Sequence, residues 1–331
     1  MFLAAPRPSE IDLFEEFVET ILVPGGCNLV VLRVCYGYQF ASHPECATPD
    51  EPLSLAQARR IAGIFRKHGI RLIPKMNLLG HQAPRTGGPQ AVDRTYGLLH
   101  GHPALDENPE AAVEYCPSLC PRHPEIKPIV FGLMDEIIDA FGADAIHIGM
   151  DEVFILGECE RCKDTPKHIL FAEWVNALAA HVKQSRGAQV LMWGDRLLDS
   201  AATGLCEWEA SANGTHQAIE LVNKDILICD WHYNGSQAYP SVGVFARAGF
   251  QILVCPLHRE NGKKFLEYAA AHDEGHIAGL LQTSWEESGQ IAGHMLRNPA
   301  DYPGRRFDAE RMKKMVETIE WIFGRTAAIE N

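Results

Sequence analysis

The segment Ala145-Ile146-His147-Ile148-Gly149-Met150-Asp151-Glu152-Val153 shows the pattern that decides the fold, an apolar run of strand length that stops at two acidic side chains. Runs that are apolar at nearly every position are typical of parallel strands, which are buried on both faces. The same pattern recurs along the whole chain. The eight predicted strands are residues 2–5, 28–34, 71–76, 145–149, 190–193, 226–231, 252–255 and 279–285.

Segments between and after these strands carry apolar residues three and four positions apart, which indicates amphipathic helices. The eight predicted helices are residues 10–22, 53–68, 125–141, 169–185, 216–222, 240–248, 264–271 and 307–323. Strands alternating with helices in this number predict an α/β fold, a (β/α)8 TIM barrel. An open doubly wound sheet is the alternative, but no Gly-rich phosphate turn follows the first predicted strand.

Composition and charge narrow the class of protein. The 331 residues are 46% hydrophobic and 22% charged, which excludes disorder, collagen and coiled coil. No linker or low-complexity stretch divides the chain, so we expect one catalytic domain over residues 1–331. The net charge of −13, without a block of Lys or Arg, argues against nucleic acid and anionic membranes as partners. No apolar run is long enough to span a membrane and residues 1–6 do not resemble a signal peptide, so a cytoplasmic protein is expected.

Two neighbouring acids are the first candidates for catalysis. The active site of a TIM barrel lies at the C-terminal ends of the strands, and Asp151 and Glu152 follow the predicted fourth strand directly. At a strand end the backbone can turn and direct both carboxylates into one pocket. Adjacent carboxylates perturb each other, so that one of them is suited to act as an acid. Capping of a following helix is the alternative role for either residue.

Aromatic side chains close three other predicted strands. Trp193 ends the fifth strand, Trp231 and Tyr233 end the sixth, and Trp285 ends the eighth. Any one of these would ordinarily be core packing. Together at a barrel mouth beside two carboxylates, they form walls for the apolar face of a ring whose hydroxyl groups the acids bind. A small sugar or oligosaccharide is therefore the predicted substrate class.

Three segments resemble glycoside hydrolase family 20, the β-N-acetylhexosaminidases. His147–Val153 is similar to the family signature His-x-Gly-Gly-Asp-Glu, with Met150 in place of the second glycine. Residues 74–81, Pro-Lys-Met-Asn-Leu-Leu-Gly-His, resemble its third-strand segment, and residues 285–287, Trp-Glu-Glu, resemble its Trp-x-Glu. The resemblance runs through most of the barrel. It implies a retaining exo-β-N-acetylhexosaminidase that needs no cofactor and hydrolyses terminal β-linked N-acetylhexosamine by substrate-assisted catalysis.

The resemblance also implies roles for individual residues. Glu152 would protonate the glycosidic oxygen and then activate water, while Asp151 would orient the 2-acetamido group that attacks the anomeric carbon. Glu287 would bind the O4 and O6 hydroxyls, and Arg7 the O3 and O4 hydroxyls, with a solvated surface position as the alternative for Arg7. The implied sugar-binding set is Arg7, His81, Trp193, Trp231, Tyr233, Trp285 and Glu287.

Departures from the family pattern keep two other functions open. Lys75 and Asn77 stand where the family's third strand usually carries acids, and residues 33–39 lack its usual Asp. Residues 254–258 lack the Tyr that hydrogen-bonds the acetamido carbonyl, a role that Tyr233 could take over. The first alternative is a glycan-binding barrel without catalysis. The second is a barrel glycosidase with an enzyme carboxylate as nucleophile, acting on another sugar.

The spacing of the histidines predicts no catalytic metal site. Four cysteines, Cys116, Cys120, Cys159 and Cys162, leave three states open: a structural zinc site, reduced thiols in loops near the active face, or a disulfide in an exported protein. The cysteines at 27, 35, 206, 229 and 255 lie singly in or beside apolar segments, and we expect them to be reduced and buried.

Two further expectations concern surfaces. Asp195, Arg196 and Asp199 follow the fifth predicted strand, and a surface salt-bridge cluster is favoured for them over a second rim of hydroxyl-binding groups. A homodimer is an open possibility, because the helices on the outside of a barrel can pair with another subunit.

Overall fold

A computed structural model describes residues 1–82, 96–110, 116–302 and 309–326. Its strands are β1 (Phe2–Ala4), β2 (Leu29–Arg33), β3 (Arg71–Lys75), β4 (Ala145–His147), β5 (Gln189–Trp193), β6 (Leu227–Trp231), β7 (Ile252–Cys255) and β8 (Ile277–Leu280). They form one sheet in sequence order, each parallel to the next. The sheet closes through Phe2, whose N donates to Gln282 O at 2.7 Å and whose O accepts from Ser284 N at 3.1 Å. The predicted (β/α)8 barrel is confirmed.

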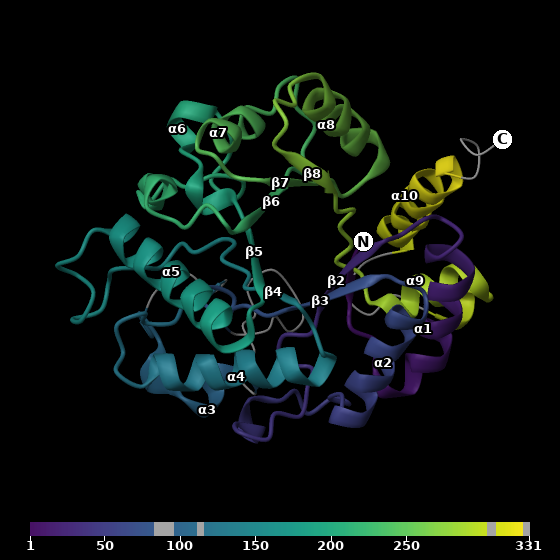
Figure 1. The fold of residues 1–331 in the computed structure, drawn as a ribbon, viewed down its shortest axis with the longest axis horizontal. Helices are drawn as coiled ribbons and strands as arrows, with labels where there is room; N and C mark the ends of the chain where they lie inside the picture. Colours follow the sequence, from purple (N-terminus) through teal and green to yellow (C-terminus); the bar gives the residue numbers. More distant parts are fainter. Residues whose placement is uncertain (83–95, 111–115, 303–308, 327–331) are drawn as a thin grey trace.

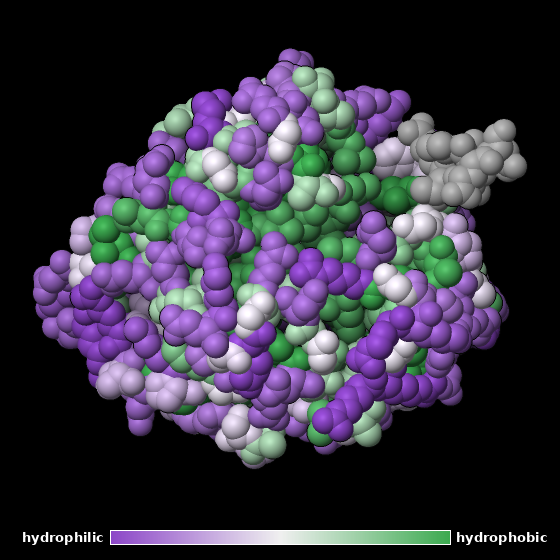
Figure 2. Space-filling model, viewed as in Figure 1, coloured by the Kyte–Doolittle hydropathy of each residue, from purple (hydrophilic) through white to green (hydrophobic). Residues whose placement is uncertain are grey.

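Helices surround the strands (Figure 1). They are α1 (Ile11–Phe17), α2 (Leu55–Lys67), α3 (Leu98–Gly101), α4 (Ile126–Phe141), α5 (Lys167–Arg186), α6 (Ser200–Thr203), α7 (Ser241–Arg247), α8 (Arg259–Ala271), α9 (Ser288–Leu296) and α10 (Ala309–Thr326). Within the described residues, none of these helices has both the length and the apolar character that a membrane span requires. The face seen in Figure 2 is mostly hydrophilic, with hydrophobic side chains visible between polar ones near its centre.

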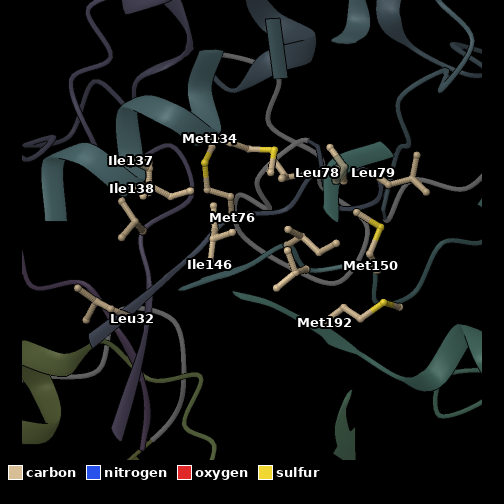
Figure 3. Packing of buried hydrophobic residues seen from close by; sticks show 14 of the residues in the cluster. Leu32, Met76, Leu78, Leu79, Met134, Ile137, Ile138, Ile146, Met150 and Met192 are labelled. Atoms are coloured by element: carbon tan, nitrogen blue, oxygen red, sulfur yellow. The ribbon is translucent and has the colours of Figure 1, made fainter. Parts of the chain in front are cut away.

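The core has two layers because the strands are buried on both faces. Inside the barrel, Phe2, Val31, Ile73 and Leu191 belong to one cluster of buried residues. Alternate residues such as Leu32 and Ile146 face outward and pack under the helices in a second, larger cluster (Figure 3). Successive side chains of a strand point to opposite faces, so this arrangement accounts for runs that are apolar at every position.

Most predicted elements occur within a few residues of their expected limits, and the exceptions have local causes. The predicted strand 279–285 is wrong in extent, because β8 ends at Leu280. Beyond it, Gln282 Nε2 donates to Leu257 O at 2.6 Å and Thr283 Oγ1 donates to Pro256 O at 2.5 Å, which holds this segment against the end of β7. Residues 216–222 form a 3-10 helix over Thr215–Glu220 rather than an α-helix.

Helix α9 was not predicted from the sequence. It contains two glycines, which have a low intrinsic helix propensity. The glycines allow close packing instead: a Cβ at Gly289 would lie 2.3 Å from the carboxyl carbon of Glu10. Residues 307–308 of the last predicted helix lie outside the described residues, as do residues 83–95 and 111–115 of the connection between β3 and α4. Of the five single cysteines, Cys229 and Cys255 are buried as expected, Cys27 and Cys35 are partly exposed, and Cys206 is exposed.

Candidate active site

A cavity of about 830 Å³ opens at the C-terminal ends of the strands. All nine site residues predicted from the sequence line it: Arg7, His81, Asp151, Glu152, Trp193, Trp231, Tyr233, Trp285 and Glu287. The structure therefore brings together residues from the ends of β1, β3, β4, β5, β6 and β8. This is the position at which barrel enzymes carry their catalytic groups.

The turn after β4 directs both acids into this cavity. Gly149, Met150 and Glu152 have left-handed backbone conformations, with φ of 77°, 79° and 50°. These conformations break the strict alternation of a strand, so that Asp151 and Glu152 both reach the same histidine, His81. Glycine is favoured at position 149, because the backbone is left-handed there and a Cβ would lie 3.0 Å from Met76 O and 2.9 Å from Asn77 Oδ1. The side chain of Met150 packs into the outer hydrophobic cluster (Figure 3) and is not part of the cavity lining.

His81 lies between the two carboxylates. Its Nε2 is 3.2 Å from Asp151 Oδ2 and 3.2 Å from Glu152 Oε2, and its Nδ1 is 3.3 Å from Cys116 Sγ. The preceding residue, Gly80, allows the two loops to approach, since a Cβ at Gly80 would lie 3.0 Å from Asp151 O. One imidazole thus connects the loop after β3 to both acids.

Burial and neighbouring charges shift the pKa values of three groups in the site, Asp151, His81 and Cys116. Burial alone would raise the pKa of Asp151, but the positive charges of His81 and Lys75 outweigh it and hold that pKa well below its usual value. Burial opposes protonation of His81, yet Cys116 and Asp151 together raise the pKa of His81 well above its usual value. Burial also raises the pKa of the Cys116 thiol to about 12, although the neighbouring His81 acts to lower it.

Lys75 and His147 occupy the inside of the barrel below the acids. Both are buried, at 1% and 0% exposure, and they are paired across β3 and β4. Burial and the charge of Lys75 lower the pKa of His147 to about 3, so this histidine is neutral. Lys75 Nζ donates to Asn77 Oδ1. Where the family pattern carries acids, this chain therefore places a buried cation that favours the ionised form of Asp151.

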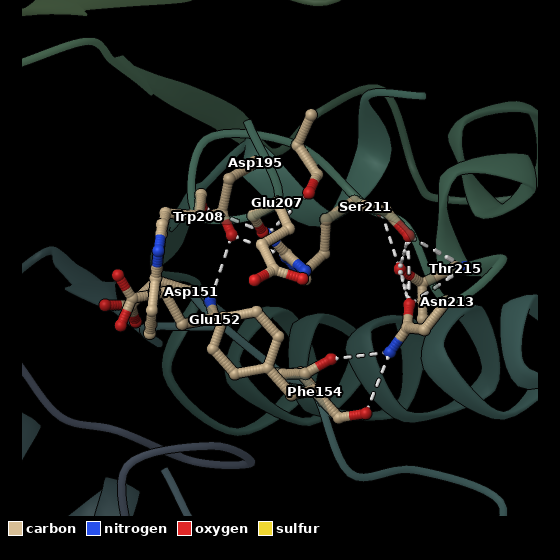
Figure 4. A network of polar contacts seen from close by, with 12 residues as sticks. Asp151, Glu152, Phe154, Asp195, Glu207, Trp208, Ser211, Asn213 and Thr215 are labelled. Atoms are coloured by element: carbon tan, nitrogen blue, oxygen red, sulfur yellow. Dashed lines mark hydrogen bonds and ion pairs between the residues drawn. The ribbon is translucent and has the colours of Figure 1, made fainter. Parts of the chain in front are cut away.

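The expectation of a surface salt-bridge cluster after β5 is wrong. Asp195 and Arg196 are 2% and 0% exposed, because residues 207–210 cover them. Asp195 Oδ2 accepts from Glu152 N at 2.9 Å (Figure 4) and from Arg196 Nε at 2.7 Å, and Oδ1 accepts from Trp231 Nε1 at 3.2 Å. Burial raises the pKa of Asp195 to about 6. Asp199 is separate and caps α6 through a 2.9 Å bond from Ala201 N.

The aromatic residues serve as core and as cavity lining at once. Trp193 is fully buried at the base of the cavity, and its ring centre is 5.3 Å from that of Phe2. The ring centres of Trp231 and Tyr233 lie 4.8 Å apart, and Trp285 Nε1 donates to Tyr233 Oη at 2.9 Å. The phenol oxygen accepts in that bond, and Tyr233 lines the cavity. That Tyr233 takes over the role of the missing tyrosine stays a prediction.

The polar rim of the cavity contains ion pairs. Arg7 Nη2 lies 2.8 Å from Asp50 Oδ2, and the Arg7 side chain is 22% exposed, so the fully solvated alternative does not apply to it. Arg33 Nη2 lies 3.8 Å from Glu287 Oε1. Charged groups that are already oriented by a partner are suited to bind sugar hydroxyls.

Sequence reasoning missed Trp208 and Glu209, which also line the cavity. Trp208 is 43% exposed and its ring centre lies 5.0 Å from that of Phe154. Glu209 Oε2 lies 2.8 Å from His232 Nδ1, and Glu209 Oε1 accepts from Asn234 Nδ2 at 3.1 Å. Arg196 holds this segment through bonds to the carbonyls of residues 207, 208 and 210. The segment belongs to the β5–β6 connection and follows no strand end, so a search of strand ends does not reach it.

The structure places the four cysteines that the sequence analysis considered for zinc in two separate groups. Cys116 contacts His81 and lies 3.6 Å from Glu152 Oε2. Cys120, Cys159 and Cys162 form a separate group with Glu107. A zinc site made of all four cysteines is therefore wrong.

Comparison with known proteins agrees with the fold and the site. The model of the glycosyl hydrolase family 20 catalytic domain matches residues 46–290. Hexosaminidase D of Bos taurus is 22% identical over 283 residues, covering 79% of this chain and 76% of that protein. Hexosaminidase D of Homo sapiens is 27% identical over 194 residues, covering 51% of this chain but only 38% of that protein.

Solved structures show the same fold at low identity. An exo-β-N-acetylglucosaminidase of Vibrio harveyi superposes with a TM-score of 0.60 at 13% identity, covering 98% of this chain and 57% of that one. Dispersin B superposes with a TM-score of 0.55 at 17% identity, covering 96% and 97%. This chain thus spans little more than half of the Vibrio protein and nearly all of dispersin B. Since the family model covers most of the chain, the resemblance seen in the sequence is confirmed, and the protein belongs to glycosyl hydrolase family 20.

Proposed function

We propose that this protein is a retaining exo-β-N-acetylhexosaminidase that removes terminal β-linked N-acetylhexosamine from an oligosaccharide. The main observation in its support is that the carboxylates of Asp151 and Glu152 both lie 3.2 Å from His81 Nε2. Both acids line a cavity whose other walls include Trp193, Trp231 and Trp285. Two carboxylates beside aromatic walls provide what hydrolysis of a glycosidic bond requires, an acid and a stabiliser of positive charge.

Asp151 is suited to the acetamido group because it stays ionised. In substrate-assisted catalysis the acetamido carbonyl oxygen attacks the anomeric carbon and the acetamido nitrogen gains positive charge. A carboxylate whose pKa is held well below its usual value by His81 and Lys75 can accept a hydrogen bond from the N–H group of that cation. The attack by the substrate itself makes an enzyme nucleophile unnecessary.

Glu152 is assigned the proton transfers. In the first step it gives its proton to the glycosidic oxygen as the bond from that oxygen to the anomeric carbon breaks and the oxazolinium ion forms. In the second step it takes a proton from the water that attacks the same carbon and reopens the ring. Two displacements at one carbon retain its configuration. The hydrogen bond from Glu152 N to Asp195 fixes the backbone from which this side chain extends.

Chromogenic substrates test the proposal directly. The full chain is incubated with the 4-nitrophenyl β-glycosides of N-acetylglucosamine and N-acetylgalactosamine, with the β-glucoside as the matched substrate that lacks the acetamido group. Release of nitrophenol from an N-acetyl substrate and little from the glucoside supports the proposal. Binding of sugar without release would instead indicate a glycan-binding barrel.

An inhibitor separates the two possible nucleophiles. A thiazoline that mimics the cyclised intermediate should bind far more tightly than N-acetylglucosamine, because catalysis requires the site to fit that intermediate. Equal affinity for the two compounds, together with a covalent glycosyl-enzyme trapped by a fluorosugar, would assign an enzyme carboxylate as nucleophile.

A further inference from the structure

Three thiols and one carboxylate that the catalytic proposal does not use meet between two loops. Glu107 and Cys120 come from the connection between β3 and α4, and Cys159 and Cys162 come from the loop between β4 and α5. Their nearest ligand atoms all lie within 4.8 Å of one another. Glu107, Cys120 and Cys162 are buried, and Cys159 is partly exposed.

Distances between the sulfurs fit ligands of one metal ion. Cys120 Sγ lies 3.4 Å from Cys159 Sγ and 3.6 Å from Cys162 Sγ. Sulfurs held at a Zn–S bond length of about 2.3 Å in a tetrahedron lie roughly 3.8 Å apart. A disulfide would require about 2.05 Å. Thiols alone are weak hydrogen-bond donors and give little reason for three of them to converge in a buried place.

The carboxylate of Glu107 indicates a bound cation independently of the distances between the sulfurs. Its Oε1 accepts from Glu158 N at 2.8 Å and from Cys159 N at 3.3 Å, which orients the carboxylate toward the cysteines. Its Oε2 is buried and has no hydrogen-bond partner within the described residues. A buried carboxylate oxygen without a partner costs free energy, unless a cation binds it.

We propose that Glu107, Cys120, Cys159 and Cys162 bind one Zn²⁺ ion in a structural site. Three thiolates and one carboxylate complete a tetrahedron and leave no open position for water, as expected of a structural rather than a catalytic zinc. The spacing Cys159-x-x-Cys162 is common for two ligands of such a site. The partly exposed Cys159 provides an entry path for the ion.

The ion would join the two loops that carry the catalytic groups. One of these loops also holds His81 and Cys116, and the other begins with Asp151 and Glu152. A cross-link between them restricts the loops without touching the substrate. The site is separate from the cavity at the C-terminal ends of the strands, whose lining includes none of the four ligands.

Metal content of the reduced full chain tests the proposal. The protein is produced in zinc-supplemented medium, purified without chelators and measured by mass spectrometry of the metal. About one equivalent of zinc is expected. Exchange with Co²⁺ should give the visible absorption of a tetrahedral ion and a strong thiolate charge-transfer band in the near ultraviolet. The cobalt spectrum needs no variant, so it remains informative if a substituted chain fails to fold.

Variants locate the ion. Cys162→Ser and Glu107→Gln should lose most of the bound zinc, whereas Cys206→Ser, which replaces an exposed cysteine elsewhere, should retain it. Cys116→Ser should also retain zinc, since the Cys116 thiol contacts His81 and Glu152 rather than the three other thiols. A reduced wild-type chain that binds no Zn²⁺ when it is supplied would overturn the proposal. Loss of the ion only in Cys116→Ser, or a disulfide between Cys120 and Cys159 in the native chain, would do so equally.

Discussion

Asp151 and Glu152 are neighbours in the chain, but the proposed mechanism begins with Asp151 ionised and Glu152 protonated. Asp151 lies close to two positive groups, His81 and Lys75, which keep it ionised. Glu152 is joined through its backbone to the buried Asp195 and faces the cavity. At the residue scale, each role can therefore be tested by removing one charge while keeping the shape of the side chain.

Replacing Glu152 by Gln should slow hydrolysis by about 10²–10⁴-fold, the usual contribution of a positioned proton transfer. Substrates with acidic leaving groups should lose less in the first step, because their oxygens need less help from a proton. Turnover of a series of aryl glycosides measures this. Glu160→Gln, at an exposed acid, is the matched control. Equal losses across the series would contradict the acid role.

Replacing Asp151 by Asn should lower kcat by about 10²–10³-fold with a much smaller change in KM, because the carboxylate acts on charge that develops in the transition state. Steady-state kinetics on one N-acetyl substrate gives both constants. An effect confined to KM would show that Asp151 only binds the ground state.

Substitutions at Met150 should follow an unusual order of stability. Met150→Gly loses a buried side chain, which costs about 2–5 kcal/mol, but relieves strain of about 1 kcal/mol at φ 79°. Met150→Ala loses nearly the same packing and keeps the strain. We therefore expect Ala to be more destabilising than Gly in urea unfolding, the reverse of the order inside a helix. The helix order at this position would show that the strain is absent.

At the element scale, His232 at the end of β6 connects three segments. Its Nδ1 lies 2.8 Å from Glu209 Oε2, and its Nε2 lies 2.8 Å from Ser241 Oγ and 3.2 Å from Asp230 Oδ1. Burial opposes its charge, but Asp230 and Glu209 outweigh burial and raise the pKa of His232 to about 9. The charged imidazole thus joins the β5–β6 connection to β6 and α7.

The pH dependence of stability follows from this shift. Because the pKa of His232 is raised from 6.5 to about 9 in the folded chain, its stabilisation is complete below pH 6.5 and is lost as pH rises through 9. The free energy of unfolding should fall by roughly 3 kcal/mol over this range of pH. Urea unfolding at pH 6, 7.5 and 9 measures it. His232→Gln should remove most of this slope, and His272→Gln, at an exposed histidine, should keep it. An unchanged slope in His232→Gln would assign it to other groups.

At the scale of the whole molecule, Phe2 joins the two ends of the sheet. Its backbone closes the barrel against residues 282 and 284, and its buried ring lies 5.3 Å from Trp193 and 5.0 Å from Trp285. Barrel closure and the floor of the cavity therefore depend on the same residue, the first through its backbone and the second through its ring.

Phe2→Ala should destabilise the fold by about 3–5 kcal/mol, the usual cost of removing a buried aromatic ring. It should also raise KM, since Trp193 and Trp285 lose the ring that they pack against. Phe2→Leu keeps much of the volume and should cost less in both measurements. Urea unfolding and steady-state kinetics are the readouts, and a loss below about 1 kcal/mol for Phe2→Ala would mean that the ring contributes little to the stability of the barrel.

The sequence by itself determined the barrel and, partly through the family resemblance, the nine predicted lining residues. A parallel strand buried on both faces must be apolar throughout, and polar residues at its C-terminal end must enter the mouth of a barrel, so a local pattern carries this information. The Asp-Glu pair and the Trp-x-Glu segment are equally local. That is why the family could be recognised from short stretches of the chain.

Only the tertiary structure decided which side chains share a place across loops. The burial of Asp195 and Arg196 depends on residues 207–210 folding over them, and Trp208 and Glu209 reach the cavity from the same connection. Cys120 meets Cys159 and Cys162 whereas Cys116 turns to His81, although spacing alone would group all four. These contacts depend on the packing of loops far apart in the chain, which no local periodicity encodes.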